Sequence, residues 1–334
     1  LKKEESNNYQ FINDELQRIE SKVNDVFFFF RANKIPFSKE KFLEQYESKE
    51  TKINSEFDFF ECFDEYLLSG SLSKAYNTIK AQKTIKGYLQ SFQNETGFNI
   101  SFNKIDNIFY EELMKYSFFE KKIKNNYFAK IIAVLKSFLK WCTDKGYNNL
   151  REFEKFKGIE HDVDIIYLTH DELMQLYNYD FENSRLNHTK DFYCMGCFTG
   201  LRFSDLSQLH QANITETHIN ISIQKTKTQN HIIRLNKFSK EILDKYQGTI
   251  YEPLPSISMQ KFNDYIKECC QIVGIDKPTT ITGFVGTKKI QNTLPKYQLM
   301  TSHTARKTFI TNSLLLGMEP KAIKKIANIK KDAV

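Results

Sequence analysis

The chain has 334 residues, 40% of them hydrophobic, and its 48 Lys and Arg residues outnumber its 41 Asp and Glu residues, for a net charge of +7. This length predicts two domains, and the modest positive charge favours a polyanionic partner. No apolar run approaches the length of a membrane span and no signal peptide is visible, which argues against a membrane or exported class. The six cysteines lack the repeated spacing of a zinc site and indicate reduced thiols in a cytoplasmic protein.

Residues 1–54 are polar, with apolar residues at helical intervals. They predict one long helix followed by a turn near Pro36. The chain opens with Leu1 rather than Met, so we expect its natural N-terminus to lie upstream. The simplest interpretation of this segment is a helical linker with no binding role.

Residues 55–150 show a clear helical period. One apolar face comprises Phe128, Ile131, Ile132, Leu135, Phe138, Leu139 and Cys142. Lys130 and Lys136 lie off this face, and Lys80 and Lys83 belong to a basic stripe on an earlier predicted helix. Lysines on outer helix faces suit contacts with DNA phosphates, although such a charge run is more often only a solvated surface.

A charged, apolar-poor segment at 151–164 predicts an exposed linker. Thr169 and Glu172 then have the spacing of a capping box, which predicts the start of a helix. The second domain accordingly spans residues 165–334.

An apolar run from Phe192 to Phe198 leads through Gly200 to Arg202, where a buried helix is predicted to resume. The run contains a lone CxxC, Cys194 to Cys197, which we interpret as core packing. A buried guanidinium requires an anion, and either Asp205 or a ligand phosphate can supply it. For an isolated arginine the structural ion pair is the more common case.

Two further stretches carry cations. Residues 219–235 alternate apolar and polar side chains around Lys225 and Lys227, which predicts a β-hairpin with a basic tip. In the stretch from Ser302 to Phe309, His303 and Arg306 are three residues apart and share one face of a predicted helix.

Residues 238–246 and 257–273 also predict helices, whereas 279–300 is mixed and interrupted by Gly283, Gly286 and Pro295. The predicted fold class is therefore mainly α with a small antiparallel β-sheet.

The order Arg202, Lys225, His303-x-x-Arg306 resembles the active site of the tyrosine recombinase (phage integrase) family, most closely integrases of the Bacteroidetes type, from about residue 55 to the end. The resemblance implies a two-domain, C-shaped DNA clamp. Residues 55–150 would form a helical, SAM-like core-binding domain and 165–334 an α+β catalytic domain. Residues 1–54 would then follow an arm-binding domain that is absent here.

The resemblance also implies site-specific recombination of a mobile element through a 3′-phosphotyrosyl intermediate, by a tetramer on double-stranded DNA in the bacterial cytoplasm, at the nucleoid. Arg202 and Arg306 would clamp the phosphate, and His303 would donate a hydrogen bond or assist proton transfer. Lys225 would be the general acid, with Lys227 as the alternative, and Asp205 would orient Arg202. No metal or cofactor is implied. The residues expected to contact DNA are Lys80, Lys83, Lys130, Lys136 and Lys227.

The sequence departs from the family pattern near its end. Asn328 and Ile329 stand where a Gly and a His or Trp are expected, and every tyrosine precedes His303. We expect the nucleophilic tyrosine to lie beyond Val334. The alternative is a catalytically inactive homologue that binds DNA on the same fold.

Overall fold

The structure is a computed structural model that describes residues 9–32, 35–52, 57–148, 150–223, 225–226 and 228–329. The chain divides into two compact units. Unit 1 comprises Leu1–His161 and Phe284–Lys288, and unit 2 comprises Asp162–Gly283 and Lys289–Val334. None of the helices within these described ranges is long and apolar enough to span a membrane.

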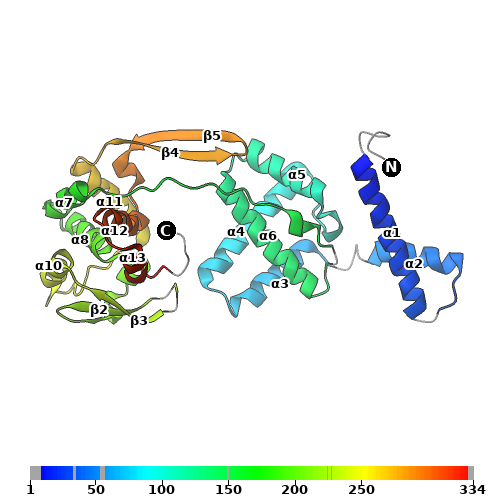
Figure 1. Cartoon of the computed structure of the whole chain (residues 1–334), viewed down its shortest axis with the longest axis horizontal. Helices are drawn as coiled ribbons and strands as arrows, with labels where there is room; N and C mark the ends of the chain where they lie inside the picture. Colours follow the sequence, from blue (N-terminus) through cyan, green and yellow to red (C-terminus); the bar gives the residue numbers. More distant parts are fainter. Residues whose placement is uncertain are drawn as a thin grey trace. The chain divides into compact units, whose positions relative to one another are not determined.

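The first two helices pair through aromatic rings. α1 (Tyr9–Ala32) and α2 (Lys39–Lys52) are joined by a short connection that contains Pro36 (Figure 1). The ring of Phe27 lies 5.5 Å from that of Phe37 and 5.2 Å from that of Phe42. The predicted long helix is confirmed, and residues 35–38, which include Pro36, are not helical.

The rest of unit 1 is helical. Its elements are α3 (Phe59–Ser71), α4 (Tyr76–Thr96), η1 (Phe102–Lys104), α5 (Asn107–Lys115), the π-helical turn η2 (Tyr116–Glu120), α6 (Asn125–Asp144) and η3 (Glu152–Lys155). The predicted apolar face of α6 is buried along its whole length. Phe63 and Phe138, whose ring centroids are 4.3 Å apart, lie at the centre of an aromatic core.

The turn of a hairpin from later in the chain belongs to unit 1. The side chain of Asn125 accepts a hydrogen bond from the Gly286 N–H at 2.7 Å and donates one to the Gly286 carbonyl at 2.9 Å. The imidazole of His161 stacks on the ring of Phe284 at 4.2 Å. This hairpin, β4 (Pro278–Val285) and β5 (Lys288–Pro295), occupies the stretch that the sequence left as mixed.

Unit 2 is organised around a buried helix, α8 (Ser184–Thr199). Its other helical elements are α7 (His170–Asn178), α9 (Phe203–Leu206), η4 (Leu209–Gln211), α10 (Lys237–Tyr246), α11 (Met259–Ile272), η5 (Lys296–Leu299), α12 (Ser302–Leu315) and α13 (Pro320–Ile326). Gly196 lets α12 approach α8 closely, because a Cβ there would lie 3.1 Å from the Cβ of Ala305. Cys194 and Cys197 are buried in this core, which confirms their predicted packing role.

A three-stranded antiparallel sheet of order β1-β2-β3 completes unit 2 (Figure 1). β1 (Asn213–Ile214) pairs with β2 (His218–Ile223), and β2 forms the predicted hairpin with β3 (Thr228–Arg234). The register is irregular between Ile221 and Ile223, just before the hairpin turn. The predicted capping box of Thr169 and Glu172 is present, and the fold class, mainly α with small antiparallel sheets, is confirmed.

Candidate active site

Arg202 lies at the N-terminus of α9, two residues after a tight helix end. Gly200 terminates α8 with φ +70° in the left-handed region. A Cβ at this position would lie 2.6 Å from Cδ1 of Phe309, a residue of α12. Both the backbone conformation and the space therefore require glycine here. The close approach brings the residue pair Leu201 and Arg202 against the helix that carries His303 and Arg306.

The Arg202 side chain is partly exposed and has an acidic neighbour. Its Nη1 lies 3.8 Å from Oδ2 of Asp205, and the two side chains are 20% and 1% exposed. The two side chains therefore form an ion pair, but the distance is too long for a hydrogen bond. Nη2 donates a weak hydrogen bond of 3.4 Å to the Asn328 carbonyl. Arg202 thus combines a buried counter-charge with a partly exposed side chain.

Arg306 is a buried cation held by backbone oxygens. Only 6% of the surface of Arg306 is exposed. Nη1 donates to the Gly200 carbonyl at 2.7 Å and Nη2 donates to the Ala327 carbonyl. Burial, followed by the charge of Arg202, lowers the pKa of Arg306 to about 10, and Asp205 partly offsets this shift. The two guanidiniums are therefore close enough to repel each other, and an anion between them would relieve that repulsion.

His303 lies on the first turn of α12 and is exposed. Its pKa is lowered from the ordinary value, first by the partial loss of solvent around the ring and then by four neighbouring cations. These cations are Lys307, Arg306, Lys225 and Arg202. The imidazole is therefore predominantly neutral at neutral pH, and the field around it favours a negatively charged ligand.

Lys225 is exposed in the turn between β2 and β3. Its charge is one of four neighbouring charges that lower the pKa of His303. Lys227, which the sequence offered as the alternative to Lys225, lies outside the described residues. We call Arg202, Lys225, His303 and Arg306 the cation cluster.

The lysines predicted to contact DNA from unit 1 differ in their surroundings. Lys80, Lys83 and Lys130 are exposed. Lys136 is half-buried, and its ammonium donates to the Glu154 carbonyl at 2.7 Å and to the Phe156 carbonyl at 3.1 Å. The Lys136 side chain thus stabilises the segment after α6.

The sequence did not indicate the residues that link the cation cluster to the hairpin. Asn328 follows α13 with φ +47°, and its side-chain amide donates to the hydroxyls of Thr226 and Thr228. Nε2 of His231, a residue of β3, lies 2.8 Å from the carbonyl oxygen of Ile326. The sequence did contain a signal for Asn328. The left-handed residue that ends a helix is usually glycine and sometimes asparagine.

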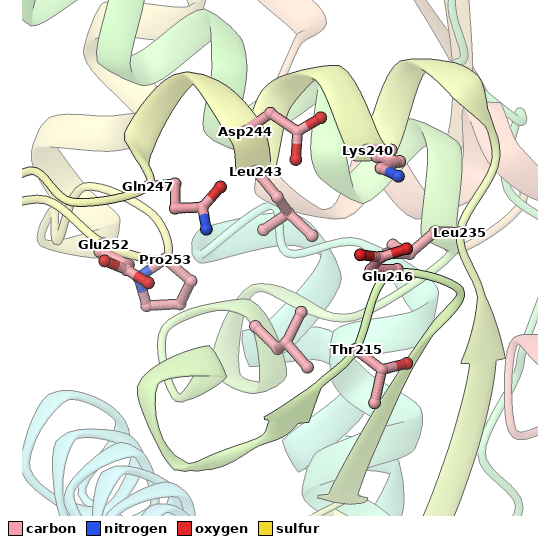
Figure 2. A pocket seen from close by; sticks show the side chains of 10 residues that line it. Thr215, Glu216, Leu235, Lys240, Leu243, Asp244, Gln247, Glu252 and Pro253 are labelled. Atoms are coloured by element: carbon pink, nitrogen blue, oxygen red, sulfur yellow. The ribbon is translucent and has the colours of Figure 1, made fainter.

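A cavity of about 600 Å³ lies elsewhere in unit 2, between the β1–β2 turn, α10 and the segment before Pro253 (Figure 2). Its ten lining residues include Glu216, Asp244 and Glu252 and none of the cation cluster. Three carboxylates disfavour a phosphate ligand, so this cavity is not the candidate anion site. Within the described parts of the chain, no group of three or more His, Cys, Asp or Glu side chains could hold a metal ion.

Solved structures of DNA-bound integrases resemble this chain. A lambda integrase tetramer bound to a Holliday junction has a TM-score of 0.63 and 15% identity, over 91% of this chain and 86% of that one. A lambda integrase dimer bound to a COC′ core site has a TM-score of 0.62 and 14% identity, over 86% and 78%. The Tn1549 transposon integrase in complex with circular intermediate DNA has a TM-score of 0.57 and 13% identity, over 82% and 92%.

The chain has the tyrosine recombinase fold. No protein-family model and no curated protein matches the sequence. Ile329 is the residue at which the resemblance to the family led us to expect a hydrogen-bond donor. Its side chain is partly buried against Phe309, Ile323 and Ala327, so this position contributes to packing.

Proposed function

We propose that this protein is a site-specific DNA recombinase that cuts and rejoins DNA strands through a 3′-phosphotyrosyl intermediate. The observation that carries the proposal is the cation cluster. It comprises four basic side chains from three separate parts of unit 2, and the charges of Arg306, Lys225 and Arg202 each lower the pKa of the fourth, His303. Such a concentration of positive charge is costly to maintain unless it binds an anion.

The two arginines would bind the non-bridging oxygens of the reacting phosphate. In the transition state these oxygens carry more negative charge than in the ground state, so fixed guanidiniums lower the barrier. Arg306 is anchored by the Gly200 and Ala327 carbonyls, which fixes its orientation before DNA arrives. The Arg202 side chain is partly exposed, and buried Asp205, 3.8 Å away, would fix its direction.

The covalent step exchanges one phosphate ester for another. A tyrosine oxygen forms a bond to phosphorus, the bond from phosphorus to the 5′ oxygen breaks, and that oxygen takes a proton. We assign this proton to the ammonium of Lys225, with Lys227 as the alternative donor. His303, neutral at neutral pH, is suited to assist removal of the tyrosine proton or to donate a hydrogen bond to the phosphate.

We further propose that the DNA is double-stranded, that exposed Lys80, Lys83 and Lys130 bind its backbone, and that the protein assembles as a tetramer on its target sites in the bacterial cytoplasm. Support comes from the structures with this fold, which are bound to DNA as a dimer and as a tetramer. The Tn1549 integrase belongs to a transposon, which supports integration or excision of a mobile element as the biological role.

A second candidate function is DNA binding without cleavage. One feature favours it: Ile329, where the resemblance predicts a hydrogen-bond donor, has a hydrocarbon side chain that packs in an apolar cluster. The two functions share the cation cluster and differ in whether a covalent bond to DNA forms.

Incubation of the full-length protein with a nicked duplex that carries its target site separates the two. The recombinase forms a protein–DNA adduct that survives denaturation and is lost on digestion of the protein. Duplex binding without any adduct would overturn the recombinase proposal in favour of the binding protein.

A further inference from the structure

The turn that follows α13 connects two halves of the cation cluster. Asn328 has φ +47°, and this left-handed conformation turns the backbone carbonyl toward Arg202 at 3.4 Å. The same residue turns its side-chain amide toward the β2–β3 hairpin, where Nδ2 donates to Thr226 Oγ1 at 2.7 Å and to Thr228 Oγ1 at 3.1 Å. One residue therefore contacts both the arginine side and the lysine side of the cluster.

The hairpin turn depends on such side-chain contacts. The last residue pair between β2 and β3 is Ile223 with Thr228, and it follows an irregularity in the register. Lys225 and Thr226 therefore lie beyond the regular β-sheet. The Thr226 and Thr228 hydroxyls are 2.9 Å apart and present one joint surface to the Asn328 amide. His231 adds a second link, to the Ile326 carbonyl at 2.8 Å.

We propose that Asn328 is a positioning residue that holds the Lys225 hairpin beside Arg202. This inference rests on the proposed recombinase function. Asn328 exchanges no proton and touches no reacting atom; it fixes the turn so that the Lys225 ammonium meets the departing 5′ oxygen. Glycine, the residue that the family pattern places here, would support the backbone turn but has no amide with which to hold the two threonines.

The first test measures the bridge itself, by hydrogen exchange in residues 225–231. Asn328→Gly keeps the left-handed backbone and the carbonyl but removes the amide, and the pair Thr226→Val with Thr228→Val removes its acceptors. Both variants should exchange faster in the hairpin, whereas the control pair Thr226→Ser with Thr228→Ser should match the wild type. Unchanged exchange in Asn328→Gly overturns the bridge.

The second test asks whether the bridge serves proton donation. A substrate with sulfur in place of the 5′ bridging oxygen releases a thiolate, which needs little protonation. On ordinary DNA, Asn328→Gly should form the covalent adduct about tenfold more slowly or worse, in line with the 10²–10⁴-fold value of a general acid. On the sulfur substrate its rate should approach that of the wild type.

The outcomes separate this inference from the proposed function. Equal slowing on both substrates would show a general structural defect and overturn the positioning role. If the wild type forms no adduct on either substrate, the recombinase proposal fails and the catalytic purpose of Asn328 fails with it. The exchange measurement still decides whether Asn328 holds the hairpin.

Discussion

Arg306 donates a hydrogen bond of 2.7 Å to the carbonyl oxygen of Gly200, a residue 106 positions earlier in the chain. This contact joins the end of α8 to α12, and a Cβ at Gly200 would collide with the ring of Phe309 on α12. The loop that carries Arg202 is thereby fixed against the helix that carries His303 and Arg306. The geometry of the cation cluster depends on this junction.

Gly200→Ala should therefore destabilise unit 2 strongly. The left-handed backbone costs a non-glycine residue roughly 1–2 kcal/mol, and displacement of the Phe309 ring adds about 1–3 kcal/mol. Gly248→Ala is the matched control, because Gly248 has φ +72° but no atom within 4 Å of the added Cβ. Urea unfolding should show a loss for Gly200→Ala that exceeds that of Gly248→Ala; equal losses would show that the Phe309 contact contributes little.

DNA affinity should rise as pH falls, through His303. Its pKa is lowered below 6.5 in the free protein, and a bound phosphate would raise it, so binding takes up a proton between the two values. The lowered pKa also affects the stability of the protein without DNA. Because the folded state binds fewer protons than the unfolded state, the free energy of unfolding falls as pH drops below 6.5.

Binding titrations between pH 5 and 8, the range in which histidines ordinarily titrate, measure this linkage. His303→Gln should flatten the dependence, whereas His170→Gln, at an exposed position on α7, should leave it intact. A pH dependence that persists in His303→Gln would assign it to another group.

Two lysines on α6 should behave differently. Lys130 is exposed. The plot of log affinity against log salt has a negative slope, and Lys130→Ala should make that slope shallower by about 0.9, the value of one lost phosphate contact. Lys136 instead holds the Glu154 and Phe156 carbonyls. Lys136→Ala should lower the unfolding free energy of unit 1 by about 1 kcal/mol or more and leave the salt slope unchanged. A shallower salt dependence of DNA affinity in Lys136→Ala would instead support the predicted contact between Lys136 and a DNA phosphate.

The sequence predicted local features better than distant ones. The capping box at Thr169, the apolar face of α6 and the hairpin around Lys225 each follow from the spacing of side chains within one element. The β4–β5 hairpin was missed, because β5 is largely exposed and lacks the alternation of a half-buried strand.

The contacts that fix the cation cluster were also hidden from sequence patterns. Arg306 and Arg202 are held by the carbonyls of Gly200, Ala327 and Asn328. Every residue has a carbonyl, so side-chain identity gives no sign of which ones face an arginine. Only the folded chain shows that the turn after α13 reaches both guanidiniums.

The central claim is that Arg202 stabilises the transition state of a DNA phosphate, and its most direct test is Arg202→Ala in the full-length protein. Duplex affinity and the rate of covalent adduct formation are measured side by side on the same nicked substrate. The account predicts nearly unchanged affinity with a rate lowered by about 10²-fold or more. Equal losses of affinity and rate, or an unchanged rate, would contradict it.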